Sequence, residues 1–219
     1  MHVDVRPLGD AAVIATVGDR VDAATAHRAR CLQARLRASL SSALSDVVAA
    51  YASVVVRFDP AVVGLAQVIA AVRGAAASGA DACGQAGALV AVRVSFGGDD
   101  GPDLDSAATR LGMPADRLVD AFCAAAYEVA FLGFLAGFPY LLGLPQALHL
   151  PRHRTPRTRV RAGSVGIAAD QCGIYPRESP GGWQILGRTD AVVFDPTRQP
   201  AALLNAGDSV RFVPARAPW

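Results

Sequence analysis

The sequence predicts an α+β protein of two domains, and three observations support this. The first part of the chain alternates strand-like and helix-like segments, whereas the part after Tyr127 consists of short β-rich runs between Gly and Pro clusters. The 219 residues are enough for one large or two small domains that bury a core. Charged residues make up 18% of the chain and hydrophobic residues 52%, which is typical of a folded protein.

The first half predicts a layer of helices on a sheet. We expect strands over residues 12–17, 46–50, 53–58 and 88–96, and helices over 22–39 and 61–77, where apolar residues recur at helical spacing. This β-α-β-β-α-β order suggests a ferredoxin-like layer of two helices on an antiparallel sheet. The small, polar segment 78–87 is expected to be a linker or loop before the last strand.

The second half predicts a small β-barrel or sandwich. The glycine turn GGDDGPD precedes two short helices predicted over residues 104–111 and 115–125, the second started by Pro114. Strands are then predicted over residues 160–168, 183–186, 191–194 and 209–213. Short strands between Gly and Pro clusters are typical of a closed or two-layered β-structure.

The stretch from Val129 to Pro151, VAFLGFLAGFPYLLGLPQALHLP, contains no charged side chain and is long enough for a membrane span. Its glycines and prolines would interrupt a helix and leave backbone groups unpaired in lipid. The N-terminus MHVDVRPLGD has no basic region followed by an apolar core, so no signal peptide is expected. We therefore expect a cytoplasmic protein without a membrane span.

Charge and cysteine content exclude several classes of function. The net charge of +2 is too small to indicate a nucleic-acid partner, and every basic residue other than histidine is arginine. A chain without lysine cannot form a lysine Schiff base or a Walker-type phosphate site of its own. The cysteines lie far apart, with no C-x-x-C pair and no histidine at ligand spacing, so no metal site is expected.

Arginines alternate with other residues in the segment PRHRTPRTRV and just after it. Arg157, Arg159 and Arg161 would share one face of a strand, because successive side chains point to opposite sides. Neighbouring guanidinium groups repel each other unless anions or acidic partners lie between them, which favours a surface facing a carboxylate or phosphate. A solvated edge strand, which arginines also protect from aggregation, explains the pattern equally well.

The run AGSVGIAADQCGIYPRESPGGWQILGRTD is unusually rich in glycine. Glycine permits positive φ and close approach of the backbone, which structural strands seldom need so often. Tight barrel turns explain part of the pattern, and a binding site explains the rest. In a binding site, Gln171, Ser179 and Thr189 could form neutral hydrogen bonds, and Arg188 could form a charged one.

Several long motifs, in the same order, resemble the B subunit of bacterial ATP-dependent 5-oxoprolinase, a family also called allophanate hydrolase subunit 1 or kinase A inhibitor-like proteins. They are RPLGDAAV, YASVVVRFDP, FGGDDGPDL, YEVAFLGFLAGFPYLLGLP, PRHRTPRTRVRAGSVGIAADQCGIYP and SPGGWQILGRT. The resemblance implies a ferredoxin-like domain at residues 1–87 and a cyclophilin-like β-barrel at residues 88–219, with the two short helices at its start. The uncharged stretch would then be a strand that turns into a glycine-bent loop beside a cleft.

The resemblance, taken with residue types, gives a set of candidate site residues but no catalytic residue and no metal ligand. Candidates for binding the substrate or an anion are Arg152, Arg157, Arg159, Arg188, Gln171 and Thr189. Candidates for lining the pocket are Gly133, Phe134, Gly137, Phe138, Tyr140, Gly173, Tyr175, Ser179, Gly182 and Trp183. The chain departs from the usual family pattern at Phe122, Ala136, Arg161 and Cys172, and these departures concern the substrate and catalytic competence rather than the fold.

The resemblance implies a subunit that is inactive alone. With A-subunit and C-subunit homologues it would open the lactam of 5-oxo-L-proline to L-glutamate, using ATP in the assembled complex. Two alternatives remain: a regulator that binds a sensor histidine kinase, and half of a biotin-dependent carboxyltransferase of the urea amidolyase kind. A chain without lysine cannot carry biotinyl-lysine, so the last alternative requires a separate carrier.

Overall fold

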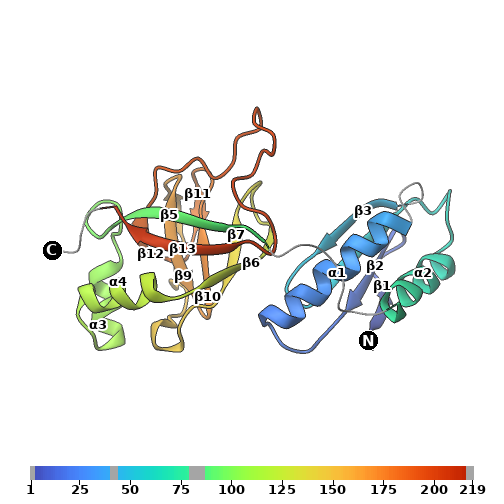
Figure 1. Ribbon diagram of the computed structural model, residues 1–219, viewed down its shortest axis with the longest axis horizontal. Helices are drawn as coiled ribbons and strands as arrows, with labels where there is room; N and C mark the ends of the chain where they lie inside the picture. The colour runs from blue at the N-terminus through green and yellow to red at the C-terminus, as the bar shows by residue number, and fades with distance from the viewer. Residues whose placement is uncertain (1–2, 40–43, 79–86, 216–219) are drawn as a thin grey trace. The chain divides into compact units, whose positions relative to one another are not determined.

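The computed structural model describes residues 3–39, 44–78 and 87–215, and it divides the chain into two compact units, Met1–Ala86 and Gly87–Trp219. Each unit has its own hydrophobic core. Figure 1 shows helices and strands in both units, which confirms the predicted α+β class. The predicted linker at 78–87 lies outside the described residues except for its two end positions.

The N-terminal unit is a four-stranded antiparallel sheet covered by two helices. Its elements are β1 (Asp4–Pro7), β2 (Ala12–Thr16), α1 (Ala23–Ser39), β3 (Leu44–Ala49), β4 (Ser53–Phe58) and α2 (Leu65–Ala77), and the strand order is β1-β2-β4-β3. Strands β2 and β4 alternate buried and less buried residues, as expected when one sheet face packs on helices. Leu32 and Leu36 of α1 and Val72 of α2 are fully buried in this core.

The predicted β-α-β-β-α-β order is wrong at both ends. Strand β1, which we did not predict, pairs with β2, whereas the strand over 89–96 belongs to the second unit. Helix α2 begins at Leu65 rather than Ala61, because the Asp59 carbonyl accepts hydrogen bonds from the backbone of Val62 and Val63 in a turn. A four-residue strand that ends in proline carries little periodic signal, and its place in the sheet depends on pairing with β2.

The second unit contains a closed barrel, which is one of the two architectures predicted for it, a β-barrel or a sandwich. Its strands are β5 (Leu89–Phe96), β6 (Tyr127–Leu132), β7 (Pro139–Leu142), β9 (Ser164–Ala168), β10 (Gln171–Ile174), β12 (Gln184–Arg188) and β13 (Ser209–Pro214), in the order β10-β7-β6-β13-β5-β12-β9. Strands β5 and β13 pair in parallel, which closes the barrel between segments far apart in the chain. Strands β8 (Arg157–Val160) and β11 (Ser179–Gly181) form a separate two-stranded sheet.

Helices α3 (Leu104–Leu111) and α4 (Ala115–Ala124) pack against one end of the barrel (Figure 1). Phe122 of α4 is fully buried and contacts the rings of Phe96, Tyr127 and Phe212. The Tyr127 hydroxyl donates a hydrogen bond to the Phe122 carbonyl at 3.0 Å. Phe122, one of the departures from the family pattern, is therefore part of the core.

Two strand predictions in the second half need correction. The run 160–168 is broken by a turn at Gly163, whose φ is +80° and whose added Cβ would lie 2.1 Å from the Thr189 carbonyl oxygen. The segment 191–194 is no strand, since its pairing is limited to a bridge between Phe194 and Ala202. Its apolar residues predicted a strand, but the backbone of this segment lies in a loop.

The uncharged stretch that resembles a membrane span begins with the hairpin formed by β6 and β7. The strands are joined by the loop from Gly133 to Phe138, so the stretch is not one continuous helix. Within the described residues, no helix is both long enough and apolar enough to span a membrane.

Candidate functional site

The arginines of β8 and the arginine that directly follows this strand line one cavity. Arg157, Arg159 and Arg161 line a cavity of about 110 Å³ together with Arg188 of β12. Asp99, Asp100 and Ser164 also line it, and the sequence did not single these residues out. Ligand pockets usually measure about 300–1,000 Å³, so a cavity of this volume has room for a small ligand only.

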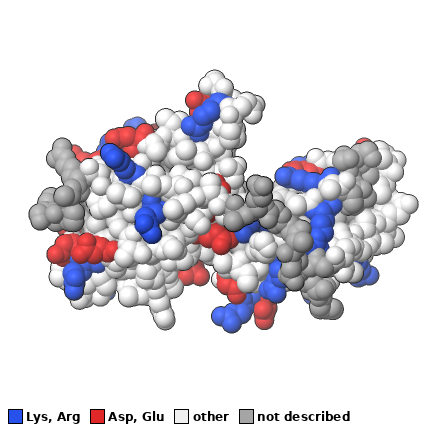
Figure 2. All heavy atoms as spheres, in the orientation of Figure 1, with Lys and Arg blue, Asp and Glu red and all other residues white. Residues whose placement is uncertain are grey.

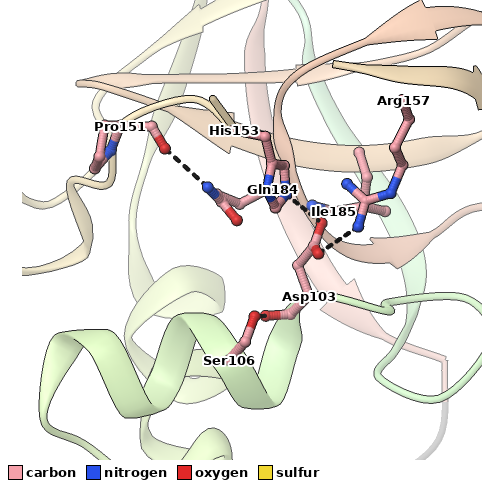
Figure 3. Close-up of polar contacts among 7 residues, drawn as sticks. All are labelled: Asp103, Ser106, Pro151, His153, Arg157, Gln184 and Ile185. Atoms are coloured by element: carbon pink, nitrogen blue, oxygen red, sulfur yellow. Dashed lines mark hydrogen bonds and ion pairs between the residues drawn. The ribbon is translucent and has the colours of Figure 1, made fainter. Parts of the chain in front are cut away.

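The carboxylate of Asp103 joins three segments at this site (Figure 3). Arg157 Nη2 donates a hydrogen bond to Oδ1 at 2.5 Å, and the backbone N–H of Ile185 donates to Oδ2 at 2.7 Å. His153 Nε2 lies 3.2 Å from Oδ2. Sequence reasoning missed Asp103, although it stands directly before a predicted helix within FGGDDGPDL, a position that favours acidic residues.

Asp103 is held in its charged form by these contacts. Its side chain is 5% exposed, and burial alone would raise the pKa of the carboxyl group. Hydrogen bonds from Arg157 and from the Ile185 backbone, with the His153 ring close by, outweigh burial and lower the pKa below its usual value. Asp103 is thus a structural anion, suited to orienting Arg157 and unsuited to accepting a proton near neutral pH.

A second carboxylate, Asp100, lies between two arginines. Arg188 Nε donates to Asp100 Oδ1 at 2.7 Å, and Arg161 Nη2 lies 3.6 Å from the same oxygen. Arg161 Nη1 also donates to the Asp99 carbonyl at 3.2 Å. The carboxylate therefore reduces repulsion between the two guanidinium groups on this side of the cavity.

The arginines at the cavity all have acidic partners in the chain itself. Arg159 forms a two-pronged pair with Glu178 on the exposed surface, at 2.9 and 2.7 Å. On the face shown in Figure 2, basic and acidic side chains lie close to each other in several places. The sequence left open whether the arginines face a bound anion or form a solvated edge strand. In the structure, carboxylates of the same chain relieve the repulsion between the guanidinium groups, so a ligand is not needed to hold the arginines together.

The segment before β8 is fastened to β12 by its backbone. The His153 N–H donates to the Gly182 carbonyl at 2.7 Å. Figure 3 shows the second bond, in which Gln184 Nε2 donates to the Pro151 carbonyl at 2.8 Å. Gln184 is fully buried, and its Oε1 has no hydrogen-bond partner among the described residues. These bonds place Arg152 beside the barrel.

The second unit also contains an aromatic cluster, defined here as Phe131, Phe134, Phe138, Tyr140, Tyr175 and Trp183. Phe138 is at its centre, 4.9 Å from Tyr140, 5.2 Å from Tyr175 and 5.5 Å from Trp183 between ring centroids. Burial raises the pKa of Tyr175 to about 12, so the phenol is neutral at physiological pH. Five of its six members were predicted pocket residues, and the structure does bring them together.

The packing of this cluster requires the predicted pocket residue Gly173 and also Gly181, which was not predicted to line the pocket. A Cβ on Gly173 would lie 2.7 Å from the Phe138 ring, and a Cβ on Gly181 would lie 2.4 Å from the Tyr175 hydroxyl. The guanidinium carbon of Arg152 lies 5.9 Å from the centre of the Trp183 ring, a cation–π arrangement. Within the described part of the chain, Arg152 has no carboxylate within 4 Å.

Other predicted site residues have structural contacts instead. Thr189 is buried and its hydroxyl accepts a hydrogen bond from the Ala191 N–H at 3.1 Å, while the Ser179 hydroxyl donates to the Pro180 carbonyl at 3.2 Å. Gln171 begins β10 and is paired with Ala168. None of the three lines the arginine cavity. The described residues contain no group of three or more His, Cys, Asp or Glu that could hold a metal ion.

The closed barrel, the helices at its end and the ion-paired cavity accompany a family match along most of the chain. The chain belongs to the family described as carboxyltransferase domain, subdomain C and D, whose model matches residues 3–204. Among curated proteins it is similar to the B subunit of 5-oxoprolinase from Escherichia coli O157:H7, with 48% identity over 128 residues that cover 58% of this chain and 59% of that protein. The chain thus matches less than two thirds of the length of this relative.

Solved structures agree with the fold. The crystal structure of TTHA0988 superimposes with a TM-score of 0.83 at 33% identity and covers 98% of this chain and 41% of that one. The Kluyveromyces lactis urea carboxylase superimposes with a TM-score of 0.76 at 19% identity, over 98% of this chain and 22% of that one. At such low identity the second match concerns the fold alone.

Proposed function

We propose that the chain is the B subunit of a cytoplasmic ATP-dependent 5-oxoprolinase, which opens the lactam of 5-oxo-L-proline to L-glutamate together with A-subunit and C-subunit homologues. The observation that carries the proposal is the similarity to the B subunit of the Escherichia coli 5-oxoprolinase, at 48% identity over 128 residues. The arginine cavity supports it, because 5-oxo-L-proline is a small carboxylate. We further infer that the N-terminal unit is a rearranged ferredoxin-like layer and that the barrel is cyclophilin-like.

The chemistry explains why several subunits are needed. A lactam is a stabilised amide that water attacks slowly, and phosphorylation of its carbonyl oxygen would supply a leaving group. The cavity of about 110 Å³ is smaller than the 300–1,000 Å³ typical of ligand pockets, so it does not fit a nucleotide. We therefore assign ATP to the assembled complex and derive no step through it from these residues.

In this proposal the chain binds and orients the carboxylate of the substrate. Arg157 and Arg188 are fixed by Asp103 and Asp100, and each guanidinium group has more donors than its carboxylate uses. Ser164 is 4% exposed, lines the cavity, and its hydroxyl has no hydrogen-bond partner within the described residues. A carboxylate in the cavity would give this hydroxyl an acceptor. Arginines that are already oriented lose little freedom when they bind an anion.

Co-expression with the A-subunit and C-subunit homologues tests this proposal. We expect ATP-dependent release of glutamate from 5-oxo-L-proline by the assembled complex and none by this chain alone. Ser164→Ala should raise KM about tenfold, because it removes one hydrogen bond to the charged carboxylate of the substrate. The melting temperature should stay nearly unchanged. Thr158→Ala on the exposed side of β8 is the matched control. Equal KM values for the two variants would exclude the cavity as the substrate site.

A second candidate function is carboxyl transfer. It is supported by the family description and by the 32% identity to urea amidolyase of Saccharomyces cerevisiae over 124 residues. Because the chain contains no lysine, this function would need a separate biotin carrier. Transfer of a carboxyl group from carboxybiotin to a urea acceptor, without glutamate release from 5-oxo-L-proline, would replace the first proposal with this one.

A further inference from the structure

The loop between β6 and β7 holds a phenylalanine in a strained conformation. The Leu135 N–H donates a hydrogen bond to the Gly133 carbonyl at 2.7 Å, which closes a three-residue turn around Phe134. The φ of Phe134 is +65°, so this is the γ-turn form with positive φ, which is rare in proteins. A bulky side chain at positive φ is a conformational outlier, and such outliers cluster at functional sites.

Burial does not explain why Phe134 occupies this position. Its side chain is 62% exposed, and its ring contacts Phe138 edge-on, at 5.6 Å between centroids. A large apolar side chain that lies in solvent contributes little to the core. The fold therefore gains little from either the backbone strain or the ring.

A chain of ring contacts connects Phe134 to Arg152 through the buried rings of Phe138 and Trp183. Phe134 contacts Phe138, Phe138 contacts Trp183 at 5.5 Å, and Arg152 lies over Trp183 at 5.9 Å. Arg152 is exposed, and no carboxylate lies within 4 Å of it in the described part of the chain. Aromatic residues and arginine are the side chains enriched at protein interfaces and among their binding hot spots.

We propose that Phe134 and Arg152 form the docking surface for a partner protein that presents an apolar pocket and a carboxylate. The Phe134 ring would enter the pocket, and the carboxylate would pair with Arg152. A protein fits better than a small molecule, because Phe134 lies out in solvent, whereas small ligands bind in concave sites. The identity of the partner, the C-subunit homologue, rests on the proposed function.

Phe134→Gly separates docking from folding. Glycine adopts positive φ without strain, which stabilises the folded state, but it also has greater conformational freedom in the unfolded chain, which stabilises the unfolded state. The two effects should offset each other, so the melting temperature should stay unchanged. We expect the affinity for the purified C-subunit homologue, measured by titration calorimetry, to fall at least tenfold. Arg152→Ala should weaken association and reduce its dependence on salt. Leu89→Ala, which truncates another exposed apolar side chain of the barrel, is the control and should bind as the wild type does.

The outcomes separate this inference from the proposed function. If the wild-type chain binds the C-subunit homologue and Phe134→Gly binds it equally well, the docking surface is wrong while the proposed function stands. A lower melting temperature with unchanged affinity would likewise overturn it, since Phe134 would then serve the fold. If the wild-type chain does not bind the C-subunit homologue, the proposed function fails and this inference falls with it. Binding of 5-oxo-L-proline to the isolated chain that is lost in Phe134→Gly would make the surface a ligand site and also overturn the proposal.

Discussion

Arg157 and Asp103 form an ion pair between residues 54 positions apart, and this pair attaches strand β8 to the start of helix α3. The same carboxylate accepts the Ile185 N–H of β12, so a single buried side chain holds three elements around the cavity. The orientation of Arg157 is therefore coupled to the stability of this part of the barrel.

Removal of Arg157 should destabilise the protein. Arg157→Ala leaves the Asp103 carboxylate buried without its charged partner, and we expect a loss of about 2–3 kcal/mol in the free energy of unfolding. Arg159→Ala, two residues along the same strand, removes an exposed pair with Glu178 and should have a much smaller effect. Urea denaturation of both variants measures this difference. Equal losses would mean that the Arg157 pair is no more important than a surface pair.

Stability should depend on pH through Asp103. Because its folded-state pKa lies below the usual value of 3.8, the carboxylate stabilises the folded state at pH values above 3.8. This contribution is lost as the pH falls below 3.8 and through the lowered folded-state pKa. Asp103→Asn should therefore be less stable than the wild type at pH 7, and the difference should shrink below about pH 4. Denaturation curves at pH 7, 5, 4 and 3 measure it, and a difference independent of pH would show that the charge of Asp103 is unimportant.

Ala136→Pro should stabilise the loop after Phe134. The Phe138 N–H donates to the Leu135 carbonyl at 3.0 Å and Gly137 has a φ of +80°, which defines a type II turn with Ala136 at its second position. Proline is favoured there, and the Ala136 N–H makes no hydrogen bond within the described residues. We expect a gain of about 0.4–1 kcal/mol, measured by calorimetry. Ala136→Gly should lower stability, and the opposite order would contradict this turn assignment.

Gly173→Ala should disturb the aromatic cluster. The added Cβ would lie 2.7 Å from the Phe138 ring and 3.0 Å from the Pro139 carbonyl oxygen, so the ring or strand β10 must move. We expect a loss of about 1–3 kcal/mol and a changed near-ultraviolet circular dichroism spectrum. Gly74→Ala in helix α2, where no atom lies within 4 Å of the added Cβ, should instead stabilise its unit by about 0.5–1 kcal/mol. Similar losses in both variants would refute the steric argument.

Local periodicity predicted most helices and strands, because apolar residues recur along each element on the face that is buried in the core. Helix α3 and strand β4 have the predicted bounds, and helix α1 begins one residue later than expected. The assignment of strands to sheets could not be predicted, since the strand over 89–96 has the same pattern whether it pairs in the first unit or with β13. Pairing between distant segments decides that question.

The candidate site was predictable in its residue types and not in its pairing. Arg157, Arg159 and Arg161 line one cavity, but Arg161 follows the end of β8 and the intervening Val160 lines the cavity too, so alternation alone does not explain it. Their partners lie far away in sequence: Asp103 is 54 positions from Arg157, and Asp100 is 88 positions from Arg188. No local pattern reports such contacts, so the acidic half of the site was missed.

Strands β5 and β13 form the seam of the barrel, and this has a consequence for synthesis on the ribosome. The seam is held at its start by Asp208, which accepts a hydrogen bond from the Ala88 N–H 120 positions earlier. The N-terminal unit can fold as it emerges, because all its strands precede Ala86. The barrel must wait until Ser209–Pro214 has been translated, and until then β5 and β6 expose unpaired edges that favour aggregation. Nascent chains that stop before β13 should therefore need chaperones more than full-length ones do.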